Sequence, residues 1–153
     1  MQAESVFPVR RVLALAAVAT AVGIACAGPG TNPNLVDVSG HWRYTERYTD
    51  AAHQTSCSDS GGYDLVQSQD GFVGVYGQRG LCTTPQGAVD NTDSGSVTEG
   101  HVVGRTIRFK APNCDYDGQT PVGSSDRLDG NVYCSAGDSH ITYTFTGTWS
   151  AVR

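Results

Sequence analysis

The sequence predicts an all-β protein, an antiparallel up-and-down meander barrel of seven to eight strands that follows an N-terminal signal helix and a flexible tether. Apolar and polar residues alternate with a period of two at both ends of the predicted barrel, in segments 38–48 and 139–152. Gly-containing turn signals separate the short segments between them, and no helical pattern occurs there. A chain of 153 residues is long enough for one such domain, which we place at 38–153.

Residues 1–25 have the pattern of an export signal. Arg10 and Arg11 precede an apolar run at 12–25, which is shorter than the roughly 20 residues that a membrane-spanning helix needs. Small residues follow this run, as is typical of a cleavage site. We therefore expect an exported protein.

Two ways of processing are compatible with the sequence around Cys26. Ala25 and Ile24 suit a lipoprotein signal, so we favour a lipid anchor on Cys26, with 26–37 as the lipidated Cys and its flexible tether in the cell envelope. Ala25, Cys26 and Ala27 also form an A-x-A cleavage site, so release after Ala27 is the alternative.

The strands can be assigned in order along the chain. In the first strand, inward residues alternate with polar ones. The inward row is Val38, Gly40, Trp42, Tyr44, Glu46 and Tyr48, and Glu46 is its one acid. Asp70-Gly71 predicts a type I′ turn between 62–69 and 72–80, and Gly104-Arg105 a type II′ turn between 95–103 and 106–111. Seven strands are clear, and 113–119 or a bent last strand supplies an eighth, because closing a meander needs an even number.

The register of these hairpins can also be predicted. Folding at Gly104-Arg105 places apolar opposite apolar and acid opposite base, pairing Val102 with Ile107, Gly100 with Phe109 and Glu99 with Lys110. Folding at Asp70-Gly71 brings Cys57 and Cys82 within two positions of a direct pair, and a hairpin about 123–125 brings Cys114 near Cys134. These pairings predict two disulfides, although four cysteines allow three connectivities.

Several segments resemble the calycin barrels, the group of lipocalins and avidins. The segment VSGHWRYTE is similar to their first strand, whose G-x-W motif matches Gly40 and Trp42; VVGRTIRFKA and DGFVGVYGQ are similar to avidin hairpins. The resemblance implies a barrel closed at one end, with Gly40, Trp42, Trp149 and Arg153 as the closing residues. Avidins line their pocket with several tryptophans, where Phe109, Leu128 and Phe145 stand here, so the resemblance does not imply biotin binding.

The inward positions are the candidate ligand-binding residues. They provide aromatic walls and one ionisable group: Tyr44, Glu46, Tyr48, Tyr76, Phe109, Leu128, Tyr143 and Phe145. The same side chains can instead fill the barrel, because the interiors of small barrels are commonly packed solid. Glu46 distinguishes the two readings, since a buried carboxylate is costly unless something pairs with it.

A possible metal site lies in the segment NCDYDGQ. Asn113, Asp115 and Asp117 alternate before Gly118, as at the start of an EF-type calcium loop, but Ser124 replaces the final Glu. We interpret the segment as a polar loop, with calcium as the alternative, and expect no cofactor.

The charge and the histidines exclude other functions. Lys and Arg number 10 against 15 Asp and Glu, so no basic footprint for nucleic acid or for lipid headgroups is present. His41, His101 and His140 fall on outward positions and His53 in a polar loop, and no catalytic or zinc motif joins them. We expect no enzyme.

Two functions therefore remain open. The first is an envelope lipoprotein whose barrel binds a small hydrophobic or aromatic molecule, with the membrane contacted only through the lipid anchor. The second is a protein-binding module with a solid core, such as a protease inhibitor or an accessory subunit of a surface complex. A sizeable cavity around Glu46 and Tyr76 would favour the first.

Overall fold

The computed structural model describes residues 35–137 and 140–153, and every element in these ranges is a β-strand. The strands are β1 (Gly40–Asp50), β2 (Thr55–Ser68), β3 (Gly71–Thr84), β4 (Gly87–Asp90), β5 (Asp93–Val103), β6 (Thr106–Ala111), β7 (Cys114–Gln119), β8 (Arg127–Gly137) and β9 (Thr142–Val152). The predicted signal peptide, Cys26 and the tether as far as residue 34 lie outside the described residues. In the described ranges, no helix is long and apolar enough to cross a membrane.

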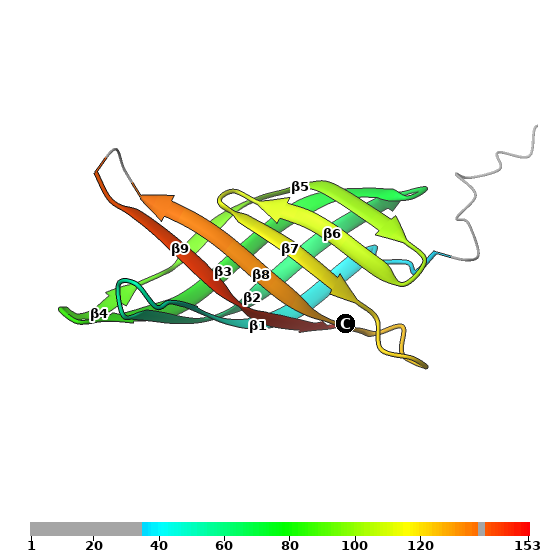
Figure 1. Ribbon diagram of the computed structural model, residues 1–153. Helices are drawn as coiled ribbons and strands as arrows, with labels where there is room; N and C mark the ends of the chain where they lie inside the picture. Colours follow the sequence, from blue (N-terminus) through cyan, green and yellow to red (C-terminus); the bar gives the residue numbers. More distant parts are fainter. Residues whose placement is uncertain (1–34, 138–139) are drawn as a thin grey trace, which may run out of the picture.

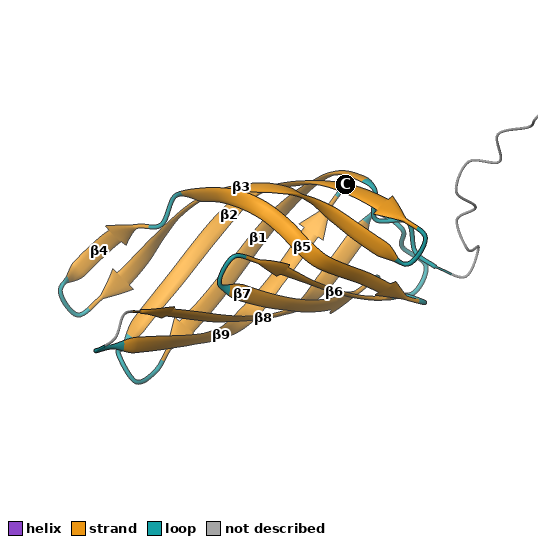
Figure 2. Ribbon diagram, turned by 90° about the horizontal axis from the view of Figure 1, so that it is seen from above, coloured by secondary structure: helices purple, strands orange, loops and turns teal. Residues whose placement is uncertain are grey.

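Eight of these strands close into an antiparallel barrel. Each strand pairs with its neighbours in the order β1, β2, β3, β5, β6, β7, β8, β9, and β9 returns to β1. The short β4 pairs only with the far end of β3 and projects from the barrel, at the left in Figures 1 and 2. The predicted meander barrel is confirmed, and residues 114–119 supply the eighth strand as β7.

Residues that alternate with a period of two in the sequence point alternately to the inside and the outside of the barrel. Along β1, buried and exposed residues alternate from Trp42 to Asp50, and Glu46 is on the buried side. The interior is filled mainly by aromatic and branched apolar side chains, and the largest fully buried ones are Trp42, Tyr63, Ile107, Leu128, Val38, Val97, Val102 and Val132. Burial of this apolar surface is the main force that stabilises the fold.

The predicted hairpin between β5 and β6 is present, with one irregularity. Gly104 and Arg105 are the two loop residues, Gly104 has a φ of 60°, and Val102 lies opposite Ile107. Glu99 adopts a φ of 52° in a bulge, so Lys110 faces Thr98 in the register rather than Glu99. The ion pair survives this shift, because Lys110 Nζ still lies 3.0 Å from Glu99 Oε2.

The hairpin between β2 and β3 differs from the prediction. Ser68 pairs with Gly71, so the loop residues are Gln69 and Asp70 instead of Asp70 and Gly71. Gln69 takes the left-handed conformation, with a φ of 58°, that we assigned to the later residues. The register therefore moves by two positions, and this shift places Cys57 directly opposite Cys82.

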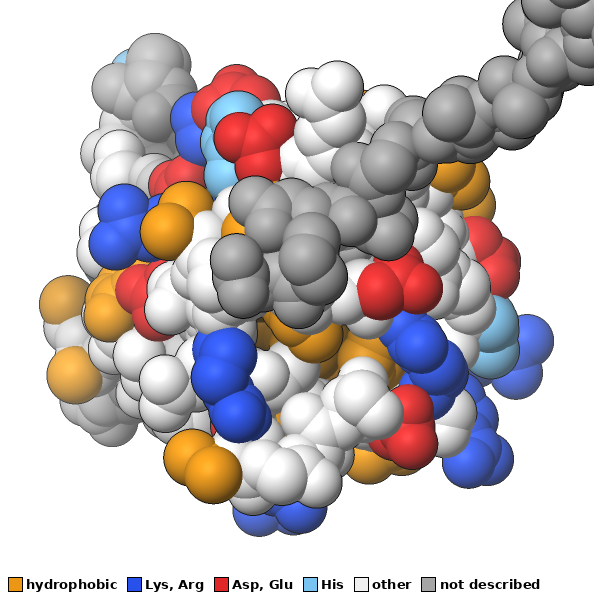
Figure 3. Space-filling model, turned by 90° about the vertical axis from the view of Figure 1, so that its right-hand side faces the viewer, with side chains coloured by type: hydrophobic (Ala, Val, Ile, Leu, Met, Phe, Trp, Pro, Cys, Tyr) orange, Lys and Arg blue, Asp and Glu red, His pale blue; other side chains and the backbone are white. Residues whose placement is uncertain are grey.

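One end of the barrel is plugged. The indole Nε1 of Trp42 donates a hydrogen bond to the carbonyl of Val38 at 2.8 Å. The guanidinium of Arg153 lies over the Trp42 ring, 4.6 Å from its centroid, and donates to the carbonyl of Asp37 at 2.7 Å. Figure 3 views this end of the molecule, where apolar side chains lie among charged ones. Gly40 opens β1 here with a φ of 113°, a conformation that suits glycine.

Two expectations about this end need correction. Trp149 does not close the barrel, because it pairs with Glu46 across β1 and packs against Tyr63 in the middle of the interior. Residues 35–37 are not a free tether, since Leu35 and Val36 pack against the core and the backbone N–H of Val36 donates to the carbonyl of Gly104.

Candidate functional site

The opposite end of the barrel holds a cavity of about 430 Å³. All eight barrel strands contribute lining residues, and β4 adds Val89 at the mouth. The β1–β2 turn adds His53, and the β6–β7 turn adds Pro112 and Asn113. The volume is in the range of small-molecule pockets, and a plugged far end leaves this mouth as the way into the cavity.

The predicted ligand-binding residues separate into two groups. Five of them line the cavity: Glu46, Tyr48, Tyr76, Tyr143 and Phe145. The other three, Tyr44, Phe109 and Leu128, are buried nearer the plugged end and do not line it. Their role is packing, since Tyr44 stacks on Tyr63 at 4.2 Å between ring centroids and Phe109 on Tyr116 at 4.6 Å.

One wall of the cavity is a continuous row of rings. Tyr48 meets Phe145 edge to face at 5.4 Å between centroids, and Phe145 stacks on Tyr143 at 6.2 Å. The imidazole of His53 extends the row to the mouth, 4.5 Å from the Tyr143 ring. The rings on β1 and β9 come together because these two strands pair across the closure of the barrel. This wall offers an apolar, aromatic surface to a ligand.

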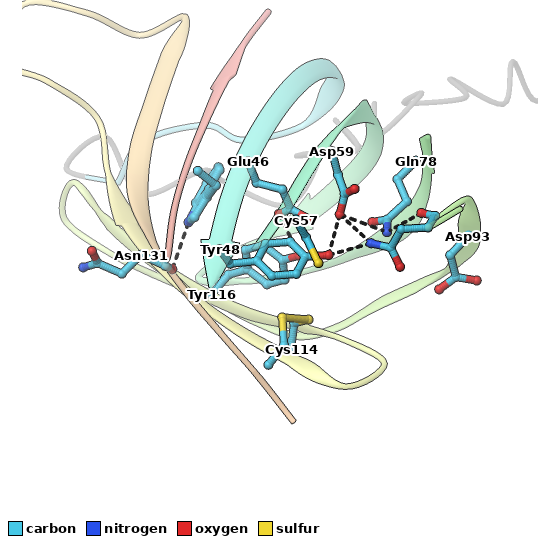
Figure 4. Close-up of a disulfide and its surroundings, with 12 residues drawn as sticks. Glu46, Tyr48, Cys57, Asp59, Gln78, Asp93, Cys114, Tyr116 and Asn131 are labelled. Atoms are coloured by element: carbon cyan, nitrogen blue, oxygen red, sulfur yellow. Dashed lines mark hydrogen bonds between the residues drawn. A yellow bond between two sulfur atoms is a disulfide. The ribbon is translucent and has the colours of Figure 1, made fainter. Parts of the chain in front are cut away.

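Two carboxylates lie deep in the same region. Glu46 on β1 and Asp59 on β2 are direct cross-strand neighbours, and each side chain is 3% exposed. Figure 4 shows both above the rings of Tyr48 and Tyr116. Glu46 lines the cavity, and its Oε2 accepts a hydrogen bond from the Tyr116 hydroxyl at 3.0 Å. Burial raises the pKa of Glu46 to about 7, and the nearby Asp59 adds to this effect while the Tyr116 hydrogen bond opposes it.

Asp59 is held by a polar network behind the cavity wall. Its Oδ2 accepts hydrogen bonds from the Tyr48 hydroxyl and from Asn91 Nδ2, the latter at 2.7 Å. Its Oδ1 is buried without a hydrogen-bond partner in the described residues. That oxygen lies against Gly80, where a Cβ atom would come within 1.6 Å of it, so β3 needs a glycine at this point. Burial raises the pKa of Asp59 as well.

The mouth carries two further acids, each with a partner. Asp50, at the end of β1, accepts hydrogen bonds from the backbone N–H of His53 and of Thr144, and its Oδ2 lies 2.8 Å from His53 Nδ1. These contacts, led by the one with the His53 ring, lower the pKa of Asp50. Asp93 on β5 accepts a hydrogen bond from the Tyr76 hydroxyl at 2.5 Å. The first pair fixes the β1–β2 turn, and the second fixes Tyr76 against β5.

Two disulfides bind the strands around this mouth. Cys57 is joined to Cys82 across β2 and β3, and Cys114 to Cys134 across β7 and β8. All four cysteines line the cavity, and the two predicted bridges are confirmed. The β2–β3 and β7–β8 pairs lie on different sides of the ring of strands, so the bridges hold the cavity wall at two separate places. Disulfides persist in oxidising compartments, which fits an exported chain.

The segment that suggested a calcium loop forms a strand instead. Asp115 and Asp117 lie on β7, where the carboxylate of Asp115 approaches Lys110 at 4.0 Å and Asp117 accepts a hydrogen bond from Asn131. Asn113 precedes the strand in a turn, so the three side chains do not converge as a calcium loop requires. In residues 35–137 and 140–153, no group of three or more His, Cys, Asp or Glu side chains is placed to hold a metal ion.

Sequence reasoning missed part of the site. The residues not foreseen are polar or lie in segments without a clear pattern: His53, Asp59, Gln78, Asn91, Asp93 and Tyr116. One signal was available for Asp59, because it follows Cys57 by two positions on the same strand. A Cys57 that faces the interior requires an inward Asp59, since strand side chains alternate with a period of two.

Comparison with known proteins leaves the family of this chain undefined. No protein-family model matches the sequence, and a search of curated proteins gives no match. Among solved structures, the chain is similar to the S-type phycobiliprotein lyase CPES from Guillardia theta, at 8% sequence identity and a TM-score of 0.42, over 76% of this chain and 88% of that chain. A likeness this distant carries no argument about ligand or reaction.

The expectation that this chain is not an enzyme is corrected. It rested on missing catalytic motifs in the sequence, and the solved structure similar to this chain belongs to a lyase. The absence of a motif does not by itself exclude catalysis, and that prediction is withdrawn. The likeness equally assigns no reaction to this chain.

Proposed function

We propose that this chain is an exported, calycin-like barrel protein that binds a small apolar or aromatic molecule in the cavity at its open end. In this proposal Cys26 carries a lipid anchor that holds the barrel at the cell envelope, and the two disulfides stabilise the cavity outside the cell. The observation that carries the proposal is the cavity of about 430 Å³ beside the row of Tyr48, Phe145 and Tyr143 rings.

The interior supports ligand binding better than a solid protein-binding module. The plugged end is packed around Trp42, but the packing stops at the level of Glu46 and Tyr48, which face the cavity. A protein-binding module needs no such cavity, whereas a ligand-binding barrel does. Because the other end is closed, a ligand would enter through the one open mouth. Its inner end would then contact the polar groups of Glu46 and Tyr116.

A neutral fluorescent probe tests this proposal. We expect N-phenyl-1-naphthylamine to gain fluorescence with the wild-type protein, and its affinity to fall at least about fivefold in Tyr143→Ala, because that ring is part of the wall. Tyr133→Ala is the matched control, since Tyr133 is 48% exposed and does not line the cavity. Equal affinity in both variants, or no binding to the wild-type protein, would contradict the proposal.

Anchoring and cargo can be examined together by native mass spectrometry of the protein isolated from its own envelope. A mass that begins at acylated Cys26 supports the anchor, and a chain that begins at Gly28 contradicts it. An additional mass that is lost on denaturation would identify the class of the bound molecule.

A further inference from the structure

The electrostatics of the cavity are one-sided. Among the described residues that line it, Glu46 and Asp93 are acids, and none is a lysine or an arginine. The basic residues of β1, Arg43 and Arg47, are exposed and alternate with the inward row. The described lining therefore contains acids without a lysine or arginine, and His53 at the mouth is its one side chain that can gain a positive charge.

Glu46 lines the cavity and has few hydrogen-bond partners among the described residues. It is 3% exposed, yet Tyr116 donates the one hydrogen bond that the described residues provide to this carboxylate. That bond uses Oε2, and in the part of the chain that the structure describes no group donates to Oε1, which leaves this oxygen for a donor in the cavity that Glu46 lines. A buried carboxylate with an unsatisfied oxygen costs free energy unless a donor or a positive charge approaches it.

Asp59 adds a second buried carboxylate beside Glu46, and it too lacks a positively charged partner among the described residues. It faces Glu46 directly across β1 and β2, and its own hydrogen bonds come from the neutral groups of Tyr48, Asn91 and Gln78. Two buried carboxylates thus lie side by side, and within the described residues no lysine or arginine pairs with either of them. A cationic ligand would supply the charge that is missing.

The aromatic wall fits the same ligand. Tyr48 adjoins Glu46 on the inward row of β1, and the rings of Phe145 and Tyr143 continue from it towards the mouth. Aromatic faces attract ammonium groups through their negative quadrupole and also accept the apolar body of a ligand. A carboxylate at the bottom and rings along the side form a complementary pair of contacts for an amine joined to an apolar group.

We infer that the cavity selects a protonated amine with an apolar or aromatic body, whose ammonium group donates to Glu46 Oε1 and whose body lies along Tyr48, Phe145 and Tyr143. This inference rests on the proposed function, because it names the chemical class of the ligand for the same cavity. It involves no covalent step.

The same geometry makes binding depend on pH. Because the pKa of Glu46 is about 7 without ligand, the carboxylate is ionised more fully as the pH rises through that value, and affinity for a cation increases with it. Asp50 and His53 lie at the mouth, where their side chains contact each other. The titratable groups that interact electrostatically with Glu46 come from β1, β2, β3 and β7: Tyr44, Tyr48, Asp59, Tyr63, Tyr76 and Tyr116.

A set of three probes of nearly equal size tests the inference by calorimetric titration of the wild-type protein. The probes are 2-phenylethylamine, which is a cation, 2-phenylethanol, which is neutral, and 3-phenylpropanoate, which is an anion. We expect the amine to bind at least about tenfold more tightly than the alcohol, as a charge-assisted hydrogen bond would provide, and the carboxylate to bind weakest. We also expect the affinity for the amine to rise between about pH 6 and pH 8.

Glu46→Gln identifies the residue that selects the cation. The preference for the amine over the alcohol should fall to within about threefold in this variant, since the neutral amide keeps the shape of the side chain without its charge. Glu99→Gln is the matched control, because Glu99 lies on β5, is exposed and does not line the cavity. Binding of the neutral naphthylamine probe checks that each variant keeps its cavity.

The outcomes separate this inference from the proposed function. Equal binding of amine and alcohol by the wild-type protein, or an amine preference that survives in Glu46→Gln, would overturn the inference while the naphthylamine probe still binds. If neither that probe nor any of the phenyl probes binds, the proposed function fails as well.

Discussion

The stability of this protein should depend on pH through Glu46, and Glu46→Gln should remove that dependence. Burial raises the pKa of this carboxyl from its usual 4.5 to about 7 in the folded barrel. The folded state therefore holds the proton more tightly than the unfolded chain does. The corresponding contribution to stability is complete below about pH 4.5 and declines as the pH rises towards about 7.

The size of the effect follows from the two pKa values. The gap between 4.5 and about 7 corresponds to about 3 kcal/mol of unfolding free energy, since one pKa unit is about 1.4 kcal/mol. Glutamine stays neutral at every pH, so Glu46→Gln has no such pH-dependent contribution to its unfolding free energy. We therefore expect the unfolding free energy of Glu46→Gln, relative to wild type, to be about 3 kcal/mol higher at about pH 8 than at about pH 4.

Urea denaturation with the disulfides intact provides the measurement, with the fluorescence of Trp42 and Trp149 as the signal. Asp50 and Asp59 also have shifted pKa values, but they are present in both proteins and their contributions largely cancel in the difference. Glu99→Gln removes only an exposed ion pair with Lys110, so its unfolding free energy should stay within about 1 kcal/mol of the wild type at every pH. Parallel profiles for wild type and Glu46→Gln would refute the argument, because they would mean that the Glu46 carboxylate is not desolvated in the folded barrel.

Two further predictions concern the wall around the cavity. Replacing Cys57 and Cys82 together by alanine should lower the unfolding free energy by about 3 kcal/mol, because the bridge joins residues with a sequence separation of 25. A fall in the midpoint of thermal denaturation would show this loss. An unchanged midpoint would argue against a role of the bridge in stability. Gly80→Ala should destabilise the barrel by about 1 to 3 kcal/mol, because its Cβ would collide with Asp59 Oδ1, whereas Gly77→Ala on the same strand meets nothing within 4 Å. Equal denaturation midpoints for the two alanine variants would show that Asp59 is not fixed against β3.

The sequence by itself determined the class of fold and much of its detail. The alternation along β1 is strict enough to place Trp42, Tyr44, Glu46 and Tyr48 on one face, because a strand with one buried side must repeat with a period of two. The turn at Gly104 was readable, since few residues other than glycine adopt its positive φ easily. Both disulfide pairings were predicted from hairpins that bring the cysteines close together, although the turn predicted at Asp70-Gly71 left Cys57 and Cys82 two positions from the direct pair that they form.

Asp59 and the exact register of β2 with β3 could not be predicted, because the local sequence signals are weak in this hairpin. The part of β2 around Asp59 reads SCSDSGG, with little apolar contrast between its two faces, so alternation alone does not orient it. The turn at Gln69 uses a residue that has no strong preference for a positive φ, so the pattern favoured the neighbouring Asp70-Gly71.

The division of the interior into core and cavity was decided only by the tertiary structure. Tyr44 and Tyr48 occupy equivalent positions in the alternation, yet one is packed in the core and the other faces the cavity. What separates them is their height along the barrel axis, which the pairing of β1 with β2 and β9 sets, and the plug of Trp42 and Arg153 at one end. Alternation tells which side of a strand faces inward, but only the closure of all eight strands determines what each inward side chain meets.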